Sequence, residues 1–374
     1  MKIHFHVPKR EQFRSFYMFF IITCSQLGVG LIGVPRTIFL EAGHDAWISI
    51  ILAYVYISLL LFTMLYILRQ YENTDLLGVQ ADLFGNFISK AIGTVYILYF
   101  LAHNLSTIIT YIEIIQVFII PDSNIFILGS MLLFLTIYTV LGGLHTVIGV
   151  TFIFNLCSTW LLLLLIEPAL QLDFLNFLPV MDREIADILR GSVATAYTFT
   201  GFEILFFIYP FIVNKEKAGK SVFFGFSWFT FVVLLFTILV IGFLSPTQLE
   251  RRIWPVLNIY KIQTTPIIER MDYIVVAEWM MVAMPKVILL TWCITHIAKR
   301  IYKIPTKISV YVTAGMILIL IPFFTEHFAI QHLIDSIRYV AYGLVYVYPL
   351  LLLPLVLIKK KIRRRQGGNH HADN

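Results

Sequence analysis

Long apolar stretches separated by short polar connections constrain this chain more than any other feature. Residues 46–68 form one of them and contain no charged side chain. About 20 apolar residues suffice for a helix to cross the hydrocarbon core of a bilayer. Ten such stretches are predicted, at residues 13–40, 46–68, 88–120, 123–141, 146–166, 187–213, 217–243, 272–299, 307–324 and 334–358.

The composition agrees with this pattern. Charged residues make up 13% of the 374 residues and hydrophobic residues 59%, against roughly 25% and 45–50% in soluble domains. A chain with so little charge cannot cover a water-facing surface, which excludes a soluble enzyme, a disordered protein and a nucleic-acid binder. We therefore expect an all-α polytopic membrane protein, with one membrane domain over residues 1–374 in contact with the lipid bilayer.

Basic residues predict the orientation of the chain, because Lys and Arg concentrate in cytoplasmic connections. With both termini in the cytoplasm, 19 of the 28 Lys and Arg residues fall in inner segments and 8 in outer ones. Six of the inner ones lie in the tail at 359–374. This tail could bind phosphoinositide or nucleic acid, but we favour an orientation signal held against anionic lipid.

Two of the predicted spans contain helix-breaking residues. The first carries Gly28, Gly30 and Gly33, followed by Pro35, and the sixth carries Gly201. Glycine and proline weaken a helix, and unwound backbone inside a membrane is tolerated where it lines a cavity. Each interruption alone could equally be a local kink or close helix packing through small residues.

The two interrupted spans occupy corresponding positions in two halves of five spans each, residues 13–166 and 187–358. Because five is odd, the second half enters the membrane from the opposite face. Paired discontinuous helices in inverted repeats are typical of transporters and mark a binding site near the middle of the membrane. Half-helix N-termini present N–H groups to an anion, and half-helix C-termini present carbonyls to a cation. An α-amino acid carries both groups and suits such a site.

Four charged residues stand out inside the predicted spans, since a charged side chain at the centre of a span costs about 2.5–3.5 kcal/mol. Glu203 follows the break in the sixth span, and Lys286 lies near the middle of the eighth. They could form a buried pair that holds the broken helix, or either could carry a proton. Glu113 and Glu278 fall in the outer third of their spans, and Glu278 could snorkel to the interface.

A polar stripe on the third span is expected to face other helices or a water-lined cavity. Its members recur at steps of three or four residues, which places them on one helix face: Tyr96, Tyr99, His103, Thr107, Thr110 and Glu113. His103 could be a packed core residue or a ligand contact, and taken alone the first is favoured. The whole stripe favours this helix as a wall of the site.

Three motifs resemble those of one known family. The run 26–36 is similar to the first-span signature of the B subunits of GerA-type nutrient germinant receptors of bacterial spores, which are endospore germination permeases of the amino acid–polyamine–organocation superfamily. The run Phe-Thr-Gly-Phe-Glu at 199–203 resembles the sixth-span motif of that superfamily. The run Glu-Arg-Met-Asp at 269–272, which ends a long outer loop, resembles a hallmark of the germination branch. The resemblance covers nearly the whole chain.

This resemblance implies ten transmembrane helices in two inverted five-helix repeats, a LeuT-like fold with helices one and six broken. It implies a pocket between spans one, three, six and eight for a small nutrient such as an amino acid. Gly28 and Gly30 would face the ligand carboxylate, and the backbone at 198–201 would receive the amino group. The fifth span lacks the lysine that some sodium-independent relatives place there. The candidate ligand contacts are Gly28, Val29, Gly30, Leu31, His103, Thr107, Thr198, Thr200, Gly201 and Phe202.

The resemblance also implies partners: an A-type membrane subunit and a C-type lipoprotein subunit in the spore inner membrane. Glu269, Arg270 and Asp272 are candidates for partner contact. The alternative is that Asp272 stabilises the start of the eighth helix, since an acid in the first turn is worth about 0.3–1 kcal/mol.

Two functions compete for the same pocket. The first is a receptor subunit that senses a nutrient and signals through its partners. The second is a proton-coupled amino acid secondary transporter that uses Glu203 or Glu113. The sequence contains no nucleophile elbow, paired carboxylates or metal-ligand spacing, so we expect no enzyme activity, catalytic residue, metal or cofactor.

Overall fold

The computed structural model describes residues 7–71, 73–262 and 270–369, with side chains omitted at 262 and 364–369. Its regular secondary structure is helical apart from one bridge between Phe13 and Ile212. By length and composition, seven of the described helical stretches could cross a membrane, or eight if one bent pair is counted as a span. Helices α1 and α5 are apolar but shorter. The all-α prediction is confirmed, and the number of ten spans stays a prediction.

The first half begins with two short helices and ends with α6 and α7, which a 3-10 segment joins. Its helices are α1 (Tyr17–Gln26), α2 (Gly30–Ala42), α3 (Ala46–Arg69), α4 (Leu76–Phe118), α5 (Ile125–Leu141), α6 (Leu144–Ser158) and α7 (Ile166–Leu170). The third predicted span starts earlier than expected, because α4 includes nine residues of helix before Gly85. Gly85 has φ 84° and ψ 171°, a conformation open to glycine that lets the helix change direction.

The second half contains ten α-helices among the described residues. Its helices are α8 (Ile185–Ala194), α9 (Ala196–Phe199), α10 (Leu205–Ile208), α11 (Lys215–Phe243), α12 (Pro246–Arg251), α13 (Pro255–Ile262), α14 (Met271–Tyr302), α15 (Thr306–Leu320), α16 (His327–Ala341) and α17 (Tyr348–Asn369). Helices α12 and α13 were not predicted. Both begin at a proline, and α12 also has a capping box between Ser245 and Gln248.

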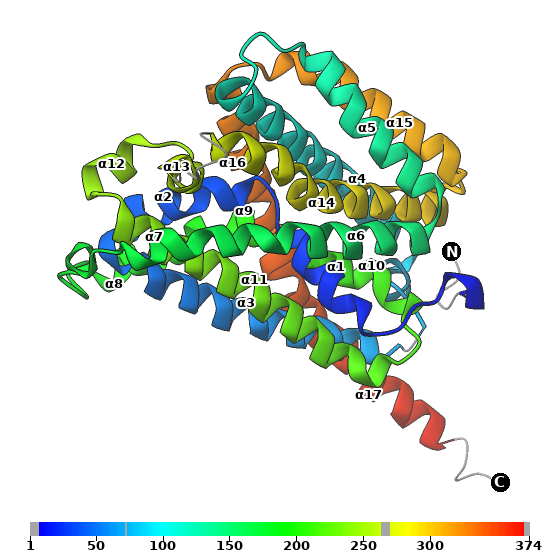
Figure 1. Ribbon diagram of the computed structural model, residues 1–374. Coiled ribbons are helices and arrows are strands. Elements are labelled where there is room, and N and C mark those ends of the chain that lie inside the picture. Colours follow the sequence, from blue (N-terminus) through cyan, green and yellow to red (C-terminus); the bar gives the residue numbers. More distant parts are fainter. Residues whose placement is uncertain (1–6, 72, 263–269, 370–374) are drawn as a thin grey trace.

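Helix packing brings the two halves together along α1 and α14. Figure 1 shows α5 and α15 at one face of the bundle and α3 and α11 at the opposite face, with α4, α14, α6 and α1 between them. Helix α1 crosses α11 at Gly225, where a Cβ atom would lie 2.5 Å from the carbonyl oxygen of Phe19. The Thr23 hydroxyl donates to the Gly225 carbonyl at 3.0 Å. Only glycine permits this close backbone crossing.

The first and the last described residues lie at the same end of the bundle, away from α7, α8 and α12 (Figure 1). We call this the inner end and the opposite one the outer end. The N-terminal segment pairs there with the second half: the Phe13 N–H donates to the Phe211 carbonyl at 3.0 Å, and the Val213 N–H donates to the Phe13 carbonyl at 2.9 Å.

The basic tail is anchored at the inner end as well. Helix α17 continues from the last span into the tail, where the Arg363 guanidinium lies 2.6 Å from the Asp82 carboxylate. Lys359 and Lys360 donate to the carbonyls of Asp82 and Gln70. The first part of the tail therefore binds the protein itself, in addition to the lipid contact that the sequence predicts.

A buried acid joins α4 to α14 at the same end. Asp75, the N-cap of α4, is fully buried and accepts hydrogen bonds from His296 at 3.0 Å and from Arg300 at 2.8 and 3.0 Å. Burial alone would raise the pKa of the Asp75 carboxyl. The hydrogen bond from His296 and the charge of Arg300 outweigh this effect and lower the pKa to about 2.

Replacing Asp75 with Asn should destabilise the protein in a pH-dependent way. Asparagine keeps the cap but loses the charge. The pKa of the Asp75 carboxyl is lowered from an ordinary value of 3.8 to about 2 in the folded protein. This difference contributes about 2 kcal/mol to the free energy of unfolding above pH 3.8, and the contribution is lost as pH falls toward 2. Melting curves in detergent should show the largest gap between wild type and variant near pH 7 and a narrowing gap from about pH 5 to 3. A gap independent of pH would contradict the assignment.

Candidate functional site

The two predicted helix breaks are both present, and they lie against each other. Helix α1 ends at Gln26 and α2 begins at Gly30. The sixth predicted span bends by 45° between α8 and α9, and α9 ends at Phe199. The Gln26 side-chain amide donates to the Phe199 carbonyl at 2.8 Å. Gly33 and Pro35 do not contribute to the first break, because α2 continues through both.

Gly201 is the point of closest contact between the breaks. Its φ of +126° is a conformation that side-chain-bearing residues rarely adopt. A Cβ atom here would lie 1.9 Å from the carbonyl oxygen of Ser25, at the end of α1. The second break therefore depends on glycine for both its backbone conformation and its packing.

One peptide group of the second break is held from both sides. The Lys286 amine donates to the Thr200 carbonyl at 3.3 Å, and the Gly201 N–H donates to the Glu203 carboxylate at 2.7 Å. Lys286 is 3% exposed and Glu203 is 1% exposed. Within the described residues the two side chains form no direct ion pair. The direct pair predicted from the sequence is therefore absent between these two described residues, and their side chains bind opposite ends of one peptide group instead.

The polar stripe on α4 faces this junction. Its members Tyr96, Tyr99, His103, Thr107 and Thr110 are all buried, which confirms that the face looks inward. His103 Nε2 lies 2.8 Å from the Thr200 hydroxyl, which donates its own hydrogen to the Tyr197 carbonyl. The Thr107 hydroxyl donates back to the His103 carbonyl and braces the helix locally.

Tyr197 was not predicted and closes the site on the α9 side. Its ring stacks on His103 at 5.0 Å, and its hydroxyl lies 2.8 Å from Ser106 Oγ. The Lys286 amine lies 5.9 Å from the centre of the ring. Periodicity cannot identify this residue, because its importance comes from the contact between α9 and α4.

Several polar atoms at the junction are buried without a hydrogen-bond partner among the described residues. They are Gln26 Oε1, Tyr99 Oη, His103 Nδ1 and Glu203 Oε1. Buried polar atoms in proteins are usually paired. Four unpaired ones around two helix breaks indicate a place where a polar ligand or a proton could be accommodated.

A cavity of about 220 Å³ reaches the junction from the outer end. Val29, Gly30, Tyr197 and Thr198 line it at the level of the breaks. Its other walls come from α2, α16 and the connection between α12 and α13, and include Arg36, Thr110, Trp254, His327 and Arg338. Gly30 keeps the cavity open beside Thr198, since a Cβ atom at Gly30 would lie 2.9 Å from the Thr198 hydroxyl.

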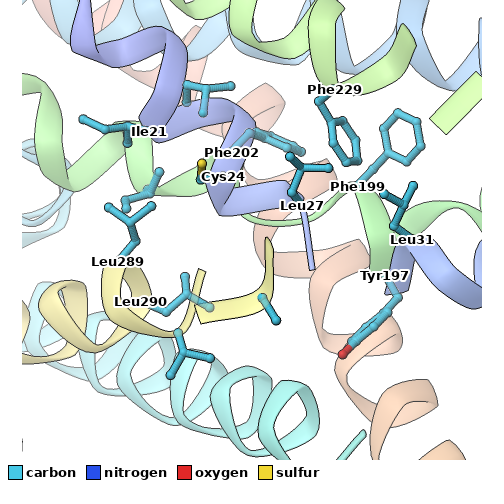
Figure 2. Close-up of a cluster of buried hydrophobic side chains, with 14 of the residues drawn as sticks. Ile21, Cys24, Leu27, Leu31, Tyr197, Phe199, Phe202, Phe229, Leu289 and Leu290 are labelled. Carbon is cyan, nitrogen blue, oxygen red and sulfur yellow. The ribbon is translucent and has the colours of Figure 1, made fainter. Parts of the chain in front are cut away.

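Apolar residues fill the space on the other side of the first break. Figure 2 shows Leu27 and Leu31 there, with Leu31 beside the ring of Phe199 and the Tyr197 hydroxyl pointing away. Leu31 lines a small cavity of about 40 Å³ together with Trp279. The indole of Trp279 donates to the Gly28 carbonyl at 3.4 Å.

The remaining candidate ligand contacts lie behind the cavity. Phe202 packs against Tyr346, with ring centres 6.0 Å apart. Gly28 faces Lys286, whose Cδ would lie 3.3 Å from a Cβ atom at that position. Among the candidate contacts, Val29 lines the outer cavity, whereas Leu31 and Phe202 are not in its lining.

The two outer carboxylates have different surroundings. Glu113 lies 2.8 Å from His327 Nδ1, which connects α4 to α16 beside the outer cavity. Glu278 is half-buried on α14. Neither contacts the junction between the breaks in the described hydrogen bonds and ion pairs.

The start of α14 carries the acid–base motif. Arg270 binds Asp272 through two hydrogen bonds of 3.0 and 2.8 Å and stacks over the ring of Tyr273 at 4.2 Å. Asp272 is buried in the first turn, and the N-cap is Arg270. Arg270 is therefore the exposed member of the pair, and Glu269 lies outside the described residues.

Comparison with known proteins gives matches over most of the chain. A family model described as "Spore germination protein" matches residues 12–331. The chain is 28% identical to spore germination protein GerQB of Bacillus cereus, over 96% of this chain and 99% of that one. It is 22% identical to spore germination protein A2 of Bacillus subtilis (strain 168), over 91% and 94%.

Solved structures show the fold. A Na+-coupled sialic acid symporter superimposes with a TM-score of 0.67 at 11% identity, covering 92% of this chain and 78% of the symporter. MhsT in complex with L-phenylalanine superimposes with a TM-score of 0.66 at 13% identity, covering 92% and 88%. The architecture is the LeuT-type transporter fold.

Proposed function

The chain belongs to the spore germination protein family, and from this premise we propose that it is the membrane subunit of a spore germinant receptor. It binds a small nutrient, an amino acid, between the two helix breaks. It passes the signal to an A-type membrane subunit and a C-type lipoprotein subunit. It lies in the spore inner membrane with both termini in the cytoplasm.

The outer cavity is the observation that carries this proposal. It ends at Gly30, where α2 begins, so that N–H groups and the positive end of a helix dipole are available to a carboxylate. Its volume of about 220 Å³ suits a small nutrient, since drug-sized ligands occupy roughly 300–1,000 Å³. The Thr200 carbonyl, predicted to receive the amino group, already binds Lys286. The unpaired oxygens of Gln26 and Glu203 are the acceptors left for an ammonium group.

A proton-coupled amino acid transporter is the second candidate. The buried Glu203 and its unpaired oxygen support it, as does the similarity in fold to transporters, one of them bound to L-phenylalanine. Glu113 is the other acid that could carry the proton, because it lies beside the outer cavity with His327.

Liposomes containing the purified protein separate the two functions. Radiolabelled amino acids and sugars are offered, and saturable binding and time-dependent uptake are measured on the same samples. A receptor subunit binds without accumulating its ligand. Accumulation under an imposed proton gradient would assign the chain to the transporters.

Replacing Gly30 with Val should abolish ligand binding. The new Cβ would meet the Thr198 hydroxyl at 2.9 Å and the Tyr197 ring at 3.4 Å, and the branched methyl groups would occupy the inner part of the outer cavity. We expect affinity to fall at least about tenfold, equivalent to about 1.4 kcal/mol. Gly149→Ala on α6 is the matched control, since no atom lies within 4 Å of the added carbon. Wild-type affinity in Gly30→Val would place the ligand elsewhere.

A further inference from the structure

A second cavity opens between α3 and α11 at the inner end, away from the helix breaks. Its volume is about 640 Å³, and its walls include Phe62, Tyr66, Phe223 and Phe224. Arg69, Glu216 and Lys220 line it at one end. A neighbouring cavity of about 350 Å³ shares Arg69 and Glu216. We call the two together the inner groove.

The inner groove runs from a polar end into an apolar region. Arg69 is the last residue of α3, and Phe62 lies about 10 Å further along the helix at 1.5 Å per residue. Phe62 is 60% exposed and Phe224 is 68% exposed. In a membrane-spanning bundle, such exposed aromatic side chains face lipid chains. The apolar part of the groove is therefore open to the bilayer.

Two basic side chains at the polar end have no partner in the structure. Arg69 and Lys220 are exposed and make no hydrogen bond or ion pair across the described ranges of the chain. Gly219 lies directly beneath Arg69, since a Cβ atom there would be 3.1 Å from Arg69 Nη2. The absence of a side chain at Gly219 leaves the guanidinium beside the groove.

The charge of this end is positive overall. Lys215 also lines it, donates to Asn73 and lies 5.8 Å from the ring centre of Tyr209. Glu216 is the acid among the residues that line the groove, set against Arg69, Lys215 and Lys220. Two unpaired cations at the end of an apolar channel complement a phosphate group joined to a hydrocarbon chain.

We propose that the inner groove binds one anionic phospholipid. The phosphate lies between Arg69 and Lys220, and one acyl chain runs along Phe62, Phe223 and Phe224 toward the middle of the membrane. The site lies on the lipid-facing side of α3 and α11, so its occupancy does not depend on a ligand in the outer cavity. A free phosphate or an acidic peptide would satisfy the cations but leave the apolar channel unused.

Native mass spectrometry of the detergent-solubilised full chain tests the proposal. Phosphatidylglycerol and phosphatidylcholine with identical acyl chains are titrated separately, and bound lipids are counted. The wild type should hold one phosphatidylglycerol more tightly than phosphatidylcholine. The variant Arg69→Gln/Lys220→Gln should lose this preference, with affinity for phosphatidylglycerol lowered about tenfold or more. The control Lys299→Gln/Lys307→Gln removes two exposed charges at the same end, outside the groove, and should keep it.

Each other result counts against the proposal. Equal binding of the two lipids by the wild type, or unchanged phosphatidylglycerol binding by the double variant, would overturn it. Displacement of the lipid by glycerophosphoglycerol, which has the headgroup without the chains, would make the site a phosphate site instead. If the double variant does not fold, the single variants Arg69→Gln and Lys220→Gln decide, each expected to lower affinity about threefold to fivefold.

Discussion

Replacing Gly201 with Ala is expected to eliminate the functional protein. The methyl group would lie 1.9 Å from the Ser25 carbonyl oxygen, and it would be attached at φ +126°. Backbone strain of this kind costs about 1–3 kcal/mol. The clash adds to this cost, because the Ser25 carbonyl oxygen and carbon that the methyl group would meet belong to the backbone and cannot rotate away. Either the two breaks separate or the chain fails to fold. Immunoblotting of membranes should show a loss of protein, and binding assays a loss of ligand binding. The expected loss of stability is far larger than the roughly 1 kcal/mol of a typical substitution.

The same measurements on Gly149→Ala provide the comparison. Gly149 lies within α6, and nothing stands within 4 Å of an added Cβ atom. Alanine favours a helix over glycine by about 1 kcal/mol, so this variant should be as abundant as wild type or more so. Normal abundance and binding in Gly201→Ala would show that the breaks do not meet as described.

Replacing Lys286 with Met is expected to have the second largest effect. Methionine keeps the apolar length of the side chain but removes the amine that binds the Thr200 carbonyl. Glu203 would then be left in the interior with no basic group on the other side of the peptide. Leaving a buried acceptor such as the Thr200 carbonyl without its donor costs about 1–3 kcal/mol, and more where a charged group is involved. Thermal melting in detergent and the amount of protein in membranes measure this loss.

A double variant shows whether the two residues act together. Adding Glu203→Gln to Lys286→Met removes both charges and keeps an acceptor near the Gly201 N–H. The double variant should therefore be more stable than Lys286→Met alone, a coupling detectable in a double-mutant cycle. Losses that simply add would show that Glu203 and Lys286 are independent.

The helix breaks could be predicted because they follow from backbone chemistry. Gly28, Gly30 and Gly201 weaken a helix wherever they occur in an apolar segment, and the structure places both breaks near them. The local sequence does not tell which glycine is indispensable. Gly201 is unique at the junction because Ser25 lies against it, and that contact joins residues far apart in the chain.

The partners of the buried charges could not be predicted. The spacing places Lys286 near mid-membrane, but its contact with the Thr200 carbonyl depends on how α14 is rotated toward α9. Tyr197 and Trp279 were missed for the same reason. Each looks like one more aromatic residue in an apolar segment until the helices are packed.

The short helices between α11 and α14 were missed for a different reason. Helices α12 and α13 are six and eight residues long, too short for helical periodicity to emerge from the sequence.

The tail was interpreted from its charge alone. Its contacts with Asp82 and Gln70 depend on the position of the α3–α4 connection, which the charge pattern does not contain.

A ligand in the outer cavity reaches the helix breaks without disturbing either terminal segment. Departure on the opposite side is different, because each terminal segment there joins one half of the chain to the other. Phe13 is bonded to Phe211 and Val213, and Arg363 to Asp82, so a path that separated these residues would break the bonds between them. The lining of the outer cavity includes none of these residues, whereas a path that separated the halves at the inner end would break one of these sets of bonds. Release at the inner end would therefore be the costlier direction.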